Sequence, residues 1–121
     1  MTDLSAELQT EIRRLRVRII GLTPRQLDQI GGQPESDDRH DRPAGPGPSR
    51  RETIRAALAE FSAIASDGRE VPDLGDGSLS DQVVVLLNHG QCVAEALPKA
   101  RRDQLLTRLL DSAVGLRRGL A

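Results

Sequence analysis

A single aromatic residue, Phe61, occurs in the whole chain of 121 residues, with no tryptophan and no tyrosine. Any hydrophobic core must therefore be built from leucine, isoleucine, valine and alanine, which suits helix-on-helix packing better than a β-sandwich. Hydrophobic residues make up 37% of the chain, a low share for a chain that buries every segment. We therefore expect one small all-α domain with part of the chain left outside its core.

Apolar residues recur at steps of three and four near the N-terminus, which is the spacing of one face of an α-helix. The predicted helix covers residues 4–20, and its apolar face consists of Leu4, Leu8, Ile12, Leu15, Ile19 and Leu22. Thr2, Asp3 or Ser5 is suited to cap its start. A separate short helix is predicted after Gly21, with Thr23 as N-cap, Pro24 at the first helical position and a glycine pair at its end.

Residues 33–48 contain four prolines and no large apolar side chain. Such a segment buries too little apolar surface to offset the conformational entropy it would lose on ordering. We therefore predict a flexible, Pro/Gly-rich linker here.

Three longer helices are predicted after this linker. Ser49 and Glu52 form a capping-box pattern that begins the first of them, and Gly68 is suited to end it. A second is predicted from a cap at Ser80 and Asp81 to about Leu97, and a third over residues 99–119. The sequence thus predicts a small antiparallel helical bundle, with an extra N-terminal amphipathic helix on a linker. Its parts are an N-terminal helical segment (1–32), the linker (33–48) and a three-helix core (49–121).

The helix predicted near residues 81–97 is apolar on most of its circumference. One stripe contains Val83, Leu86, Leu87, Gly90, Val93, Ala94 and Leu97, and Val85, Cys92 and Ala96 form a second strip on nearly the opposite side. A helix of this kind is expected to be buried on two sides. With the stripe of the first helix, it has more apolar surface than a three-helix core consumes. We therefore predict a non-catalytic association module, a homodimer or a hetero-complex, with interface residues Leu8, Ile12, Leu15, Val17, Ile19, Val85, Cys92 and Ala96.

The densest basic run supports an alternative function. Arg13, Arg14, Arg16 and Arg18 are candidate nucleic-acid contacts, because guanidinium groups bind phosphate. The formal net charge of the chain is only −1, and no stacking aromatic lies near the run. We therefore expect a solvated helix flank rather than a nucleic-acid site, and no attraction to membranes.

Two groups of polar residues have the composition of metal sites. His89 and Cys92 lie one helical turn apart, but zinc needs about four ligands, and the other histidine, His40, lies in the predicted linker. Asp37, Asp38, His40 and Asp41 lie in that linker too, without a scaffold to hold them in place. We therefore expect no metal, no cofactor and no catalytic site.

The remaining expectations concern the compartment. Cys92 is the only cysteine, which fits a reducing environment, and the acidic N-terminus lacks the pattern of a secretory signal. No apolar run approaches the roughly 20 residues of a membrane span. A cytoplasmic protein is expected, and one lysine against sixteen arginines is typical of a GC-rich bacterial genome.

Overall fold

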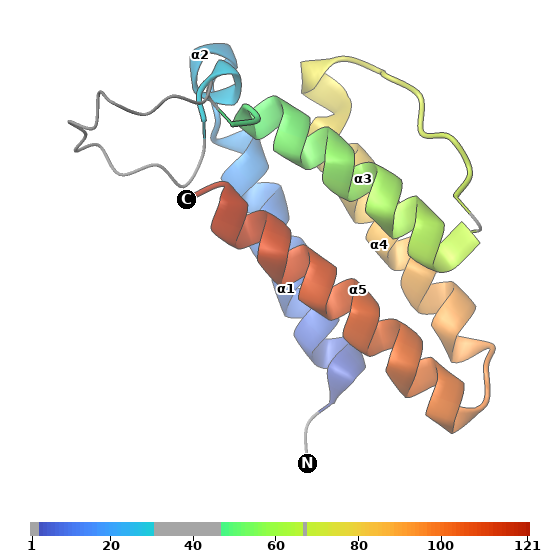
Figure 1. Ribbon diagram of the computed structural model, residues 1–121. Helices are drawn as coiled ribbons and strands as arrows, with labels where there is room; N and C mark the ends of the chain where they lie inside the picture. Colours follow the sequence, from blue (N-terminus) through green and yellow to red (C-terminus); the bar gives the residue numbers. More distant parts are fainter. Residues whose placement is uncertain (1–2, 31–46, 67) are drawn as a thin grey trace.

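The computed structural model describes residues 3–66 and 68–121 with the exception of residues 31–46, and it is all-α in these parts. Four long helices lie side by side (Figure 1): α1 (Leu4–Ile20), α3 (Arg50–Ser66), α4 (Leu79–Glu95) and α5 (Lys99–Gly119). A short α2 (Pro24–Asp28) and a 3₁₀ turn, η1 (Asp76–Ser78), complete the elements. The described residues contain no strand, only an isolated antiparallel bridge between Ile30 and Ser49.

The helix starts follow the capping signals in the sequence. The carboxylate of Asp3 accepts hydrogen bonds from two backbone N–H groups in the first turn of α1. Thr23 and Gln26 form a capping box at α2. Ser49 and Glu52 form a second box at α3, with bonds of 3.1 and 3.0 Å between side chain and backbone in each direction. These bonds satisfy N–H groups that have no partner within the helix.

The predicted cap of α4 is wrong by two residues. The helix begins at Leu79, with Ser78 as an N-cap that makes no side-chain bond, and Ser80 is buried inside the first turn. The preceding 3₁₀ turn η1 runs directly into the helix and supplies the entry that Ser80 was expected to provide.

The direction of α4 differs from the predicted antiparallel arrangement. Helices α3 and α4 run in the same direction, and the segment between them returns along α3 (Figure 1). About a dozen residues separate the two helices, enough to reach roughly 35–40 Å when extended, whereas a 17-residue helix is about 25 Å long. A loop of this length permits a parallel neighbour, while the short turn at Pro98 forces α5 to run back along α4.

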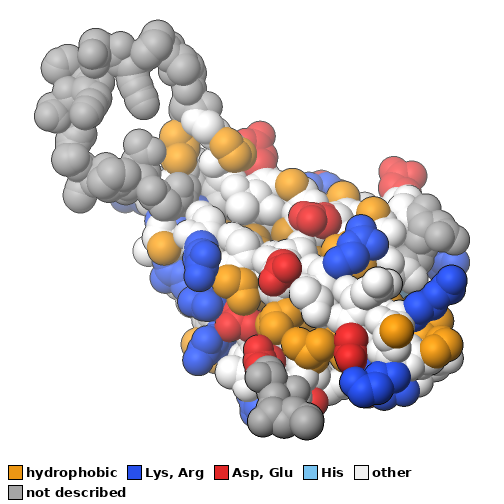
Figure 2. All heavy atoms as spheres, turned by 60° about the horizontal axis from the view of Figure 1, so that its bottom comes forward, with side chains coloured by type: hydrophobic (Ala, Val, Ile, Leu, Met, Phe, Trp, Pro, Cys, Tyr) orange, Lys and Arg blue, Asp and Glu red, His pale blue; other side chains and the backbone are white. Residues whose placement is uncertain are grey.

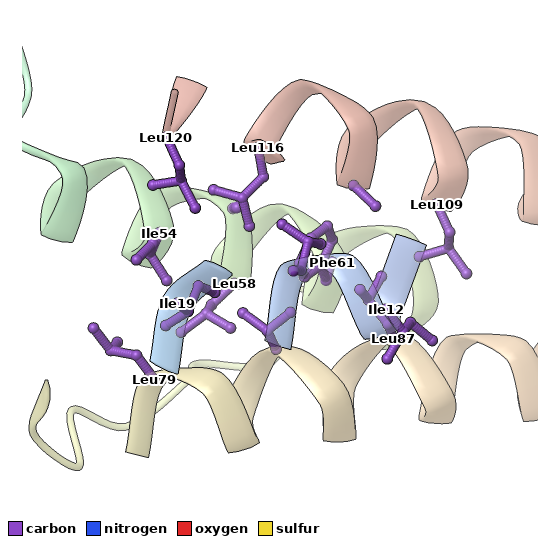
Figure 3. Packing of buried hydrophobic residues seen from close by; sticks show 14 of the residues in the cluster. Ile12, Ile19, Ile54, Leu58, Phe61, Leu79, Leu87, Leu109, Leu116 and Leu120 are labelled. Carbon is purple, nitrogen blue, oxygen red and sulfur yellow. The ribbon is translucent and has the colours of Figure 1, made fainter. Parts of the chain in front are cut away.

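The hydrophobic core includes side chains from all four long helices (Figure 3). Phe61 lies in this core together with Ile12 of α1, Leu87 of α4 and Leu109 of α5. Helix α1 packs against α4 and α5, so residues 49–121 do not form the core on their own. The reason is that the apolar face of α1 fills the side of the bundle that α3 does not cover. Residues 33–46 of the predicted linker lie outside the described residues.

Gly90 lies where three helices approach one another. A Cβ atom at this position would lie 2.7 Å from Leu109 Cδ1 and 3.5 Å from Ala65 Cβ. The missing side chain lets α4 approach both α3 and α5, as expected for a glycine at a close helix crossing.

Candidate association surfaces

The predicted interface residues fall into two groups in the structure. Four of them are buried in the core of the same chain: Leu8, Ile12, Leu15 and Ile19. The other four are exposed: Val17, Val85, Cys92 and Ala96. Only the second group leaves apolar surface for another molecule, because the first group already packs against α4 and α5 of its own chain.

An apolar hollow of about 570 Å³ lies between α4 and the loop that precedes it. Leu74 of the loop and Val85 of α4 line it and are 59% and 62% exposed. The side-chain amide of Gln82, also in its wall, donates a 2.9 Å hydrogen bond to the carbonyl of Pro72 and so ties the loop to the helix. The strip of Val85, Cys92 and Ala96 therefore continues onto the loop, which enlarges the apolar surface.

Arginines of α3 hold this loop in place. Arg51 makes a two-pronged contact with the carboxylate of Asp76, at 2.7 and 2.8 Å, and also pairs with Asp28. The bonds from Arg51 hold the pKa of Asp76 below its usual value. The pKa of Asp73 is lowered by the backbone N–H of Gly75 and then by Arg55, whose guanidinium lies 2.7 Å away. The loop is thus fixed by charged hydrogen bonds together with the partly buried side chain of Val71.

A buried carboxylate fixes α1 to the rest of the bundle. Glu11 is 5% exposed and accepts hydrogen bonds from Arg117 of α5 at 2.7 Å and from Arg14 at 3.0 Å. On the other side of α1, the side chain of Gln9 donates to Asn88 and Gln91 of α4. A carboxylate this deeply buried needs such partners, so these contacts favour one placement of α1.

A groove of about 670 Å³ runs between α3 and α5. Small residues line its middle, including Ala56, Ala57, Ser112 and Gly115. The charged residues that line it are Glu52, Glu60, Arg108 and Asp111. The groove is therefore shallow, partly apolar and more acidic than basic.

Two of the four arginines in the predicted basic run make contacts within the chain, and the other two are exposed. Arg14 pairs with Glu11, and Arg18 donates a 2.7 Å hydrogen bond to the carbonyl of Leu120. Arg13 and Arg16 are exposed, and neither has a polar partner within the described residues. Two of the four guanidiniums therefore help to hold the fold, and two face solvent.

The candidate metal residues do not assemble into a site in the described part of the chain. His89 and Cys92 are both exposed on α4, and no group of three or more histidine, cysteine or acidic side chains lies close enough there to hold a metal ion. Asp37, Asp38, His40 and Asp41 lie outside the described residues.

None of the described helices combines the length and apolar character that crossing a bilayer requires.

Two exposed apolar residues were missed in the sequence. Ile20, on the same side of α1 as Val17, is 58% exposed, and Val17 is 70% exposed. The signal for Ile20 was its position out of phase with the stripe of α1. Leu74 had no such signal, because a loop has no periodicity.

On the face shown in Figure 2, hydrophobic side chains gather in small groups separated by acidic and basic ones.

Comparisons of the chain with protein families, with curated protein sequences and with solved structures gave no match.

Proposed function

We propose that this chain is a non-catalytic helical association module that binds another protein chain or a second copy of itself. The observation that supports the proposal is the pair of apolar surfaces left outside a complete core, Val17 with Ile20 and Leu74 with Val85. Burying one such side chain fully is worth about 1.5–3 kcal/mol, so two pairs are enough to contribute substantially to binding. The 570 Å³ hollow beside Val85 offers a place for a partner side chain.

Two aspartate substitutions test this proposal on the purified chain. Val85→Asp and Val17→Asp place a charge on one surface each, while both positions are well exposed, so the fold should persist by circular dichroism. We expect at least one variant to lose assembly, or capture of a partner, in size-exclusion chromatography with light scattering. Gln104→Asp, at an exposed position of α5, is the matched control. A wild-type chain that stays monomeric at high concentration and captures nothing would refute the proposal.

The alternative function is nucleic-acid binding through Arg13 and Arg16. These exposed guanidiniums favour it, whereas the internal contacts of Arg14 and Arg18 reduce the basic surface that is free for phosphate. It predicts a mobility shift with random duplex at low salt that weakens steeply as salt rises. No shift for the wild-type chain, or the same shift for Arg13→Gln/Arg16→Gln, excludes this function.

A further inference from the structure

The groove between α3 and α5 has room for a helix. Its middle is lined by residues with small side chains, and a Cβ atom added at Gly115 would meet nothing within 4 Å. Ala56 of α3 lies on the opposite wall. Small side chains on two neighbouring helices let a third helix approach closely, so this surface is suited to a helical occupant.

The charges of the groove identify the kind of helix that fits. The helices α3 and α5 run antiparallel (Figure 1), and a Cβ atom at Gly119, near the end of α5, would lie 3.3 Å from Thr53, near the start of α3. Counting seven residues forward along α3 and seven back along α5 from this contact places Glu60 level with Ser112, next to Asp111. Neither Glu60 nor Asp111 has a salt-bridge partner among the described residues. With Glu52, these two residues give the groove three carboxylates against the single guanidinium of Arg108, and this excess of negative charge favours a basic occupant.

The outer side of α1 presents such a surface, which we call the ridge: Arg13, Arg16, Val17 and Ile20. At 100° per residue these four side chains fall within about 100° of the helix circumference. All four are exposed, and Val17 and Ile20 are apolar. The ridge thus combines two basic groups that have no polar partner among the described residues with two apolar side chains one turn further along.

We infer that the ridge of one copy occupies the groove of a second copy. This inference rests on the proposed association function and names the partner. With Arg13 and Arg16 beside Glu60 and Asp111, the apolar half of the ridge lies one turn further along, about 6 Å away. That is where Ala56 and Gly115 leave space, since Ala56 precedes Glu60 by one turn and Gly115 follows Asp111 by one turn. The register therefore satisfies the charges and the apolar residues together.

The two surfaces belong to different parts of one molecule. No residue of α1 lines the groove, and α1 packs against α4 and α5 instead. A contact between two different surfaces is heterologous, so it generates a closed ring or an open chain rather than a two-fold dimer. Each copy then carries one ridge and one groove.

This head-to-tail geometry predicts a specific result for mixed variants. Gly115→Trp fills the groove and leaves the ridge intact, and Val17→Asp/Ile20→Asp disables the ridge and leaves the groove intact. Each variant alone should be monomeric at concentrations where more than half of the wild-type chain is assembled. An equimolar mixture should form a complex of two chains only, because one ridge and one groove remain functional. Gln104→Trp, on α5 outside the groove, should assemble like wild type.

Charge reversal tests the register. Arg13→Glu/Arg16→Glu and Glu60→Arg/Asp111→Arg should each abolish assembly, and the chain with all four changes should regain it. Circular dichroism confirms that each variant is folded. If the wild-type chain assembles but Gly115→Trp leaves assembly unchanged, or if the mixture stays monomeric, this inference is wrong while the association function stands. If the wild-type chain neither assembles nor binds another protein, both fail.

Discussion

The helices α1 and α4 carry the two clearest apolar patterns in the sequence, and the fold buries them differently. The stripe of α1 packs against its own chain, with Leu8 and Leu15 fully buried and Leu4 partly buried at its start. Helix α4 buries its main stripe in the same core but leaves Val85, Cys92 and Ala96 exposed. Apolar periodicity therefore identifies a helix face that needs cover, but it does not say whether the cover comes from the same chain.

The largest expected effect separates the buried stripe of α1 from the exposed strip of α4. Leu15→Ala removes a fully buried side chain and should lower the free energy of unfolding by about 2–5 kcal/mol. Val85→Ala should change the stability of the monomer by less than about 0.5 kcal/mol. Urea denaturation of both variants at low protein concentration measures the difference. Equal losses would mean that Val85 is part of the core.

The second effect concerns the polar contact that fixes α1. Arg117→Met removes a hydrogen-bond donor from buried Glu11 and should cost about 1.5–3 kcal/mol, since a buried charge loses one of its two partners. Arg14→Met should cost less, because Arg14 is more exposed and pairs from within the same helix. Adding Glu11→Gln to Arg117→Met should restore part of the loss, and denaturant midpoints measure all three. A double variant no more stable than Arg117→Met would contradict the role of the buried charge.

The third effect concerns how α4 reaches its neighbours. Gly90→Ala forces a methyl group against Leu109, at a cost of about 1–3 kcal/mol, while alanine regains about 1 kcal/mol of helix propensity. A net loss of about 1 kcal/mol is expected in thermal or urea denaturation. Gly115→Ala is the matched control on α5, where the space is open, and it should stabilise the chain by up to about 1 kcal/mol. Stabilisation by both changes would show that α4 does not pack closely at Gly90.

The smallest effect concerns the loop that sets the direction of α4. Arg51 lowers the pKa of Asp76 in the folded chain, so this contact stabilises the fold above the unfolded pKa and is lost as pH falls through the folded pKa. Below about pH 4, wild-type stability should therefore fall more than that of Asp76→Asn. Denaturant midpoints measured from pH 7 to pH 2.5 give the comparison. Parallel curves for the two proteins would show that the pair contributes nothing.

Much of the local structure was predictable because it depends on neighbours in the sequence. The bounds of α1 and α5, the N-cap at Thr23 and the capping box at Ser49 follow from residues within one or two turns. The start of α4 was not predicted correctly, because a 3₁₀ turn replaced the serine cap. In the candidate association surfaces, Val17 and Val85 are exposed, which agrees with their positions off the main apolar stripes of α1 and α4.

The sequence by itself determined that this chain is helical, where most helices begin and end, and which face of each is apolar, since these depend on short-range spacing and hydrogen bonding. Only the tertiary structure decided that α1 completes the core, that α3 and α4 run in parallel, and that an acidic groove and an apolar hollow remain at the surface. These features depend on contacts between residues distant in sequence. A long loop permits more than one direction, and packing, the buried Glu11 and the arginines of α3 select among them.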